Sequence, residues 1–133
     1  MFRIDLNSDT LENAMKGIDT FCKKHIPDND LLFKVRLIYE EIMTNMFRHA
    51  VKLDTTFVEV GIKTSPNSVR LSFLYDGDEF DPTKYKDDRI NEPLKENTKE
   101  GGFGLFLVTN MAKSFSYKRE NGFNRIEIEI SNH

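Results

Sequence analysis

The sequence predicts an α/β (α+β) fold, a two-layer sandwich in which three helices cover one face of a sheet. Three observations support this prediction. Apolar residues recur at helical spacing over most of the first fifty residues, several other segments alternate apolar and polar residues, and turn signals separate those segments in pairs. Strands that alternate in this way have one buried and one wet face, so helices must cover the apolar face. We expect a mixed, mostly antiparallel sheet of about five strands.

The N-terminal segment reads as a short strand followed by a helix. Residues 2–6 alternate apolar and polar side chains, which is typical of a strand. Ser8 or Asp9 is the expected N-cap of a helix that reaches about Lys24, with Glu12 as a capping-box partner. Apolar residues give this helix one buried face, with Phe21 alongside: Leu11, Met15 (or Ala14), Ile18 and Cys22.

A second helix is expected from Leu31 to about Val51, with a cap in the segment Asp28–Asp30. Glu41, Asn45 and His49 are spaced four residues apart, so they form one row on the helix surface. This row borders an apolar stripe, where polar groups need either solvent or partners. It is therefore either a solvated rim or the edge of a ligand pocket. The stripe contains Val35, Ile38, Tyr39, Ile42 and Met46.

The remaining strands are expected as two antiparallel hairpins. Strands over 56–62 and 69–75 flank a Pro-Asn-Ser turn. A strand over 114–118 and a final strand containing three alternating isoleucines flank the dipeptide Asn121-Gly122, a strong hairpin signal. Gly77 follows the second strand and permits a bend there.

A charged segment and a glycine-rich turn lie between the two hairpins. Residues 84–100 contain few apolar side chains and form either a lid or a surface loop. Gly101, Gly102 and Gly104 then precede a third predicted helix that starts near Leu105. A glycine-rich turn that opens a helix presents free N–H groups, which suit a phosphate. Three glycines before a helix can also form only a tight turn.

The composition limits the function classes. A chain of 133 residues corresponds to one domain, and its formal net charge of −3 gives no basic nucleic-acid footprint. No apolar run approaches the length of a membrane span, and the N-terminus lacks the apolar core of a signal peptide. The one cysteine, Cys22, suits a reducing compartment. We therefore expect a cytoplasmic protein without direct contact to nucleic acid or membrane.

Three motifs in a fixed order resemble a known superfamily. E-x-x-x-N-x-x-x-H on a helix, D-G-x-x-F-D-P after a strand and G-G-x-G-L-x-L after a charged segment are similar to the motifs of the Bergerat-fold (GHKL, histidine-kinase-like) ATPases. The short chain and the FDP sequence look most like the anti-sigma-factor serine/threonine kinase branch. The resemblance implies a single ATPase domain over residues 1–133, with ATP and Mg²⁺ as cofactors and residues 84–100 as the ATP lid.

The resemblance also assigns roles to individual residues. Glu41 matches the catalytic general base, and Asn45 matches the Mg²⁺ ligand. One departure concerns the adenine end: Tyr75 occupies the position where the family usually has an aspartate, and Asp76 stands one residue too late. The full set of nucleotide-binding positions that the resemblance implies is Asn45, His49, Tyr75, Asp76, Gly77, Phe80, Gly101, Gly102, Phe103, Gly104, Leu105 and Asn124.

Several functions remain open at this stage. The resemblance implies a kinase that sequesters a sigma factor and phosphorylates a small anti-sigma-factor antagonist of the STAS type, acting as a homodimer. Tyr75 favours an alternative, a catalytically weak or inactive partner-binding module with impaired adenine recognition. A third reading is the detached ATPase half of a histidine-kinase relay.

Overall fold

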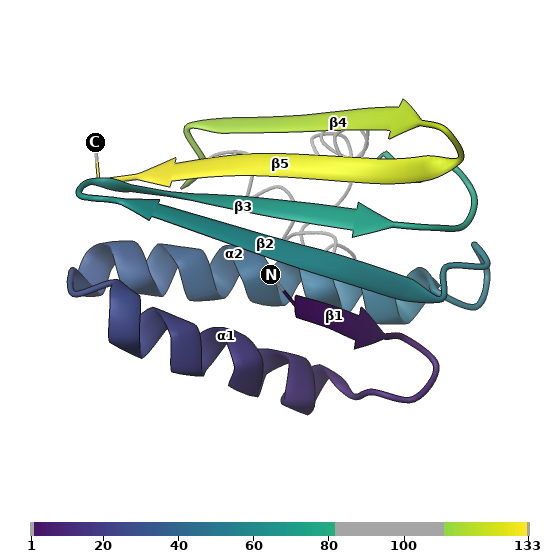
Figure 1. Cartoon of the computed structure of the whole chain (residues 1–133), viewed down its shortest axis with the longest axis horizontal. Helices are drawn as coiled ribbons and strands as arrows, with labels where there is room; N and C mark the ends of the chain where they lie inside the picture. The colour runs from purple at the N-terminus through teal and green to yellow at the C-terminus, as the bar shows by residue number, and fades with distance from the viewer. Residues whose placement is uncertain (1, 82–110, 133) are drawn as a thin grey trace, which may run out of the picture.

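The computed structural model describes residues 2–81 and 111–132 and has two layers (Figure 1). A five-stranded antiparallel sheet has the strand order β1-β2-β3-β5-β4, and helices α1 and α2 cover one of its faces. This confirms the predicted two-layer sandwich, while the third predicted helix lies outside the described residues. The elements are β1 (Phe2–Asp5), α1 (Leu11–His25), α2 (Asn29–His49), β2 (Phe57–Ser65), β3 (Ser68–Tyr75), β4 (Ser114–Glu120) and β5 (Phe123–Ser131).

Both predicted hairpins are present, and β5 joins them. β2 pairs with β3 and β4 pairs with β5, each in antiparallel register. Asn121 and Gly122 connect β4 to β5 with φ angles of 53° and 82°, as a two-residue turn with two positive φ angles requires. β5 also pairs with β3, so that Tyr75 lies opposite Asn124. Two segments far apart in the sequence thereby meet at the end of β3.

The helix starts show one correction to the sequence analysis. The prediction that Ser8 or Asp9 caps α1 is wrong: the N-cap is Thr10, whose hydroxyl accepts a hydrogen bond from the Asn13 N–H at 3.1 Å. Asp9 instead accepts the N–H of Asp5 and closes the preceding turn. Asp28 caps α2 as predicted, accepting from Leu31 N–H at 2.8 Å.

The core lies between the inner face of the sheet and the two helices. Tyr39 of α2 stacks on Phe73 of β3 with ring centroids 6.1 Å apart, and its hydroxyl donates to the Ala14 carbonyl in α1 at 3.0 Å. Cys22 is fully buried, and its burial raises its thiol pKa to about 11, so it is a packing residue as predicted. On the sheet side, the core includes alternating inner positions of β2, β3 and β5: Val58, Val60, Val69, Leu71, Phe73, Ile126, Ile128 and Ile130.

Neither described helix is long and apolar enough to cross a membrane.

Candidate functional site

The polar row on α2 lies at the border of the core, as its spacing predicts. Glu41 and His49 are half-buried, and Asn45 between them is only 3% exposed. The neighbouring stripe, including Ile38, Ile42 and Met46, faces the sheet and is buried. The polar groups are therefore held at the edge of the helix–sheet interface, where they can contact a ligand without leaving the core.

The two polar groups of the Asn45 side chain differ in their hydrogen bonding within the described residues. Its side-chain N–H₂ donates to the Glu41 carbonyl one helical turn earlier, at 2.7 Å. In the described part of the chain no donor reaches the Asn45 Oδ1 atom. A buried amide oxygen without a partner is costly, on the order of 1–3 kcal/mol, so this atom is suited to an external partner. A hard cation prefers oxygen ligands of this kind.

His49 ends the row beside an aromatic ring. Its imidazole lies against Phe80, with ring centroids 5.4 Å apart. Burial lowers the pKa of His49, and the positive charges of Arg48 and Lys52 lower it further. The imidazole is therefore neutral at pH 7 and can accept or donate a hydrogen bond.

Tyr75, the residue that replaces the expected aspartate, points into the core. It is fully buried, and its hydroxyl donates to the Phe80 carbonyl at 2.7 Å. Burial, followed by the neighbouring Tyr117, raises the pKa of the Tyr75 phenol, which stays neutral. The hydrogen bond from the phenol thus joins the two ends of the loop 76–79, and the position holds no carboxylate.

Asp76 lies directly after β3 and is engaged with the start of β2. Its carboxylate accepts hydrogen bonds from the N–H groups of Thr56 and Phe57, at 2.7 and 3.2 Å, and from the Thr56 hydroxyl. Burial raises the pKa of Asp76, but these hydrogen bonds together lower it below its usual value. The carboxylate is consequently ionised and joins two strand ends.

Gly77 is required by close packing. Its φ of +91° favours glycine, and a Cβ atom here would lie 2.5 Å from the Leu53 carbonyl oxygen and 2.6 Å from the Thr55 hydroxyl. The next residue, Asp78, donates its N–H to the same Leu53 carbonyl at 2.8 Å. The loop after β3 therefore packs closely against the segment that follows α2.

Asn124 connects all parts of this loop from the opposite strand. It is fully buried; its Nδ2 lies 3.2–3.4 Å from the carbonyl oxygens of Tyr75, Asp76 and Asp78. Its Oδ1 accepts from the Phe80 N–H at 3.2 Å and from the Tyr117 hydroxyl. In the described residues this side chain thus organises the loop. A polar residue at an inward position of an otherwise apolar alternating strand is the signal for such a role.

Two contributors were not expected from the sequence. Tyr117 of β4 points inward toward Asn124, and Arg119 donates to the Gly77 carbonyl at 2.8 Å. The alternation Phe115, Tyr117, Arg119 places all three on one face and could have suggested their shared direction. No local pattern indicates that this strand lies beside the loop after β3.

The second half of the predicted site lies outside the described residues. This holds for the proposed lid, residues 84–100, and for the glycine-rich turn with Gly101, Gly102, Phe103, Gly104 and Leu105. Within residues 2–81 and 111–132, no three His, Cys, Asp or Glu side chains gather into a metal site. A cation here would rely on the Asn45 oxygen and on the ligand that it accompanies.

An antiparallel sheet covered by helices on one face, with a polar row on α2 and a glycine loop after β3, defines the Bergerat-type ATPase fold. The chain matches the histidine kinase-like ATPase domain over residues 4–130 and belongs to that family. Membership in this family implies ATP binding. No curated protein sequence matches this chain significantly.

Solved structures share the fold at low sequence identity. A chain of the SiaB–SiaC complex from Pseudomonas aeruginosa is 13% identical with a TM-score of 0.64, over 98% of this chain and 89% of that one. The catalytic domain of histidine kinase ThkA, in a nucleotide-free form, is 10% identical with a TM-score of 0.51, over 98% and 94% of the two chains. Another nucleotide-free form of the ThkA catalytic domain is 13% identical with a TM-score of 0.50, over 98% of each chain.

Proposed function

We propose that the protein is an ATP-dependent serine/threonine kinase of the anti-sigma-factor type. The observation that carries this proposal is the buried Oδ1 atom of Asn45, which has no donor among residues 2–81 and 111–132 and lies one helical turn after Glu41. On one side of a helix, at the border of the core, a carboxylate can act as a general base and an amide oxygen can hold Mg²⁺; phosphoryl transfer uses both roles.

Asn45 fits a Mg²⁺ ion by its chemistry. Its N–H₂ group is held by the Glu41 carbonyl, so its oxygen is the end that remains for a ligand. When bound, Mg²⁺ would neutralise the charge of the ATP phosphates. We propose Glu41 as the general base, whose carboxylate takes the proton of a serine or threonine hydroxyl. His49, neutral and beside Phe80, would line the nucleotide near the end of the row.

The partners follow from the motif resemblance. We propose a sigma factor as the sequestered protein and a STAS-type antagonist as the phosphorylated one, with a homodimer acting in the cytoplasm. The structural similarity to a chain of the SiaB–SiaC complex supports a protein partner, because that fold occurs there in a complex with a second protein. The phosphate-binding turn and the lid are proposed at residues 101–105 and 84–100.

Two matched substitutions test the catalytic assignment. Glu41→Ala should retain Mg-ATP binding in isothermal titration and abolish phosphate transfer to STAS-type antagonists of the same genome. Glu40→Ala is the control, because this neighbouring carboxylate is exposed and lies outside the row. Transfer that persists in Glu41→Ala would remove the base assignment. Asn45→Ala should weaken Mg-ATP binding while leaving the magnesium-free nucleotide less affected.

The second candidate is a partner-binding module with weak or absent catalysis. The burial of Tyr75 and its bond to Phe80 favour it, because this residue offers adenine no carboxylate at the position where the family usually has an aspartate. The loss of one charge-assisted hydrogen bond costs about 1.5–3 kcal/mol, or roughly 10- to 150-fold in affinity. No heat with millimolar Mg-ATP, together with retained binding of an antagonist, would establish this module instead of the kinase.

A further inference from the structure

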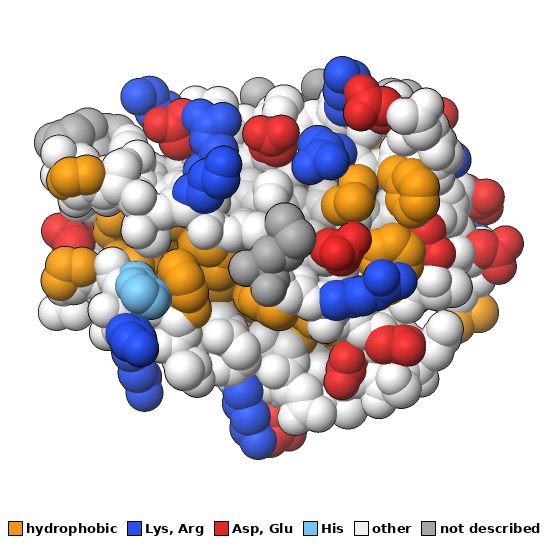
Figure 2. Space-filling view, viewed as in Figure 1, with side chains coloured by type: hydrophobic (Ala, Val, Ile, Leu, Met, Phe, Trp, Pro, Cys, Tyr) orange, Lys and Arg blue, Asp and Glu red, His pale blue; other side chains and the backbone are white. Residues whose placement is uncertain are grey.

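The face of the sheet that points away from the helices is uneven. Figure 2 shows this face with a group of hydrophobic side chains near one end, bordered by cationic and anionic residues. An antiparallel sheet can leave such a face to water, and then polar side chains are expected along it. Two features depart from that expectation: a hollow in the middle of the face and an aromatic cluster beside it.

The hollow follows from strand register. Gly61 of β2 lies opposite Ser72 of β3, and neither has a large side chain. One row away, Lys63 lies opposite Arg70, and on the other side Leu74 lies opposite Arg125. Rows on one face are about 7 Å apart, so the walls stand about 13 Å from each other. The space between them measures about 360 Å³.

The walls of this hollow carry an excess of positive charge. Arg70 pairs with Glu127 at 3.7 Å and with Glu129 at 3.3 Å. Lys63 and Arg125 also line the hollow, but neither takes part in an ion pair in the described part of the chain. The hollow therefore offers two cations in a chain whose formal net charge is −3.

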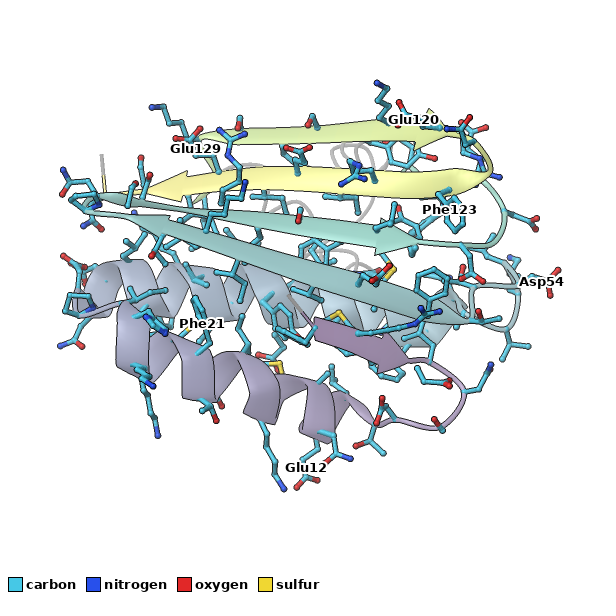
Figure 3. The ribbon with its side chains drawn as sticks, viewed as in Figure 1. Glu12, Phe21, Asp54, Glu120, Phe123 and Glu129 are labelled. Atoms are coloured by element: carbon cyan, nitrogen blue, oxygen red, sulfur yellow. The ribbon has the colours of Figure 1, made fainter. Side chains whose placement is uncertain are left out.

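The aromatic cluster extends the hollow toward the start of β5. Phe57 and Phe123 lie with ring centroids 6.3 Å apart, and the Arg3 guanidinium lies 3.9 Å above the Phe57 ring. Phe123 is 40% exposed, and Figure 3 places it at the β5 end opposite to Glu129. Leu74 and Phe123 line a second depression that shares Arg125 with the first. Arg125 thus lies between the charged hollow and the more apolar depression at Leu74 and Phe123.

We propose that this face, defined by Lys63, Leu74, Phe123 and Arg125, docks an acidic segment of a partner protein that also carries large apolar side chains. Carboxylates of the segment would lie between Lys63 and Arg125, and its apolar side chains would cover Leu74 and Phe123. A second copy of this chain would bring the same excess of cations to the hollow. A nucleic acid would set its phosphates against Glu127 in the hollow.

This docking face goes beyond the proposed function and is separate from the ATP site. The residues of the polar row lie on α2, at the opposite side of the sheet. Loss of docking should therefore leave Mg-ATP binding unchanged, and a failure of the kinase proposal would leave docking unchanged. The two proposals can fail independently.

A labelled peptide measures the docking directly. The probe is fluorescein-labelled GSDFDELSG, titrated with the full chain and followed by fluorescence anisotropy. We expect it to bind at least about ten-fold more tightly than GSKFKKLSG or GSDSDESSG, because each control removes one kind of contact. In amide NMR spectra of the full chain, the shifts should concentrate at Gly61, Ser72 and Phe123.

Charge reversal provides the matched test. The double substitution Lys63→Glu and Arg125→Glu should weaken peptide binding about ten-fold or more, because two attractions become repulsions. The control, Lys23→Glu with Lys24→Glu, makes the same change in net charge on exposed residues of α1 and should leave binding unchanged. Circular dichroism confirms that both variants are folded.

Three results would overturn the proposal. The first is an affinity of the GSDFDELSG probe no higher than that of the two control peptides. The second is equal loss of binding in both charge-reversal variants, which would indicate attraction to the whole chain. The third is tighter binding of a ten-nucleotide oligothymidine, which would make the face a polyanion site.

Discussion

Truncation of Asn124 should destabilise the protein more than any other single change at the polar network. In the described structure Asn124→Ala removes the acceptor of the Phe80 N–H and the donors to the carbonyls of Tyr75, Asp76 and Asp78. The amide has only two N–H hydrogens, so at most two of the three carbonyl contacts are full hydrogen bonds.

The magnitude follows from the groups that are left unpaired. Asn124 is fully buried, so water cannot replace its side chain without a rearrangement of the loop. Each unsatisfied buried group costs about 1–3 kcal/mol, and one N–H and two carbonyls are at stake. Partial relaxation of the loop reduces the sum, and we expect a loss of about 3–4 kcal/mol. This is a large share of the ~5–15 kcal/mol that stabilises a typical domain.

Urea unfolding at 25 °C measures the loss. For an m value of about 2 kcal/mol/M, the midpoint should fall by about 1.5–2 M. Asn13→Ala is the control, because Asn13 is exposed on α1 and its truncation should change stability by less than about 0.5 kcal/mol. Tyr117→Phe removes only one donor and should cost about 1 kcal/mol. A loss below about 1 kcal/mol in Asn124→Ala would refute the reasoning that the network is paired through this residue.

Three further predictions concern the same loop and the end of α2. Gly77→Ala should lower the stability measured by thermal unfolding by about 2–4 kcal/mol, because its φ is strained and the new Cβ clashes with the Leu53 carbonyl. The control, Gly122→Ala, has a positive φ but open space around it and should cost about 1–2 kcal/mol. Equal losses in the two variants would contradict the clash. The pKa of Asp76 is depressed in the folded state, so its stabilising contribution is present above about pH 4 and is lost as pH falls through the folded pKa. Asp76→Asn should therefore be less stable than the parent chain at pH 7, and the difference should shrink as the pH falls below about 4. Burial first, and two neighbouring cations second, lower the pKa of His49 in the folded state, so the unfolded chain binds more protons. Stability should therefore rise as the pH increases through the unfolded pKa of about 6.5. In urea unfolding, His49→Gln should flatten this rise.

The sequence was sufficient for most of the described fold. Alternation in β3 and β5, the Asn121-Gly122 turn and the cap at Asp28 each express a local preference that the structure keeps. The spacing of Glu41, Asn45 and His49 likewise places them at the border of the core, because helical geometry fixes that relation. The cap at Thr10 was missed because three neighbouring residues can all cap a helix, and only the local turn selects one.

The arrangement at the end of β3 could not be predicted in the same way. It depends on the pairing of β3 with β5, which brings Tyr75 opposite Asn124 across a long sequence separation. No local pattern specifies which strands of two hairpins become neighbours. Tyr75 faces inward like Leu71 and Phe73, but its hydroxyl reaches the Phe80 carbonyl only because the intervening loop folds back.

In the described half of the site, the polar groups of one part are hydrogen-bonded within the protein, whereas the other part leaves an acceptor for a ligand. The loop from Tyr75 to Phe80 is satisfied by the chain itself, through Thr56, Asn124 and Arg119. A ligand cannot gain much by ordering a loop that is already paired, so this end contributes shape more than new hydrogen bonds. Asn45 differs, because its buried oxygen lacks a donor among the described residues. In the proposed kinase, the free energy of ATP binding should accordingly depend more on the phosphates and the cation than on the adenine base.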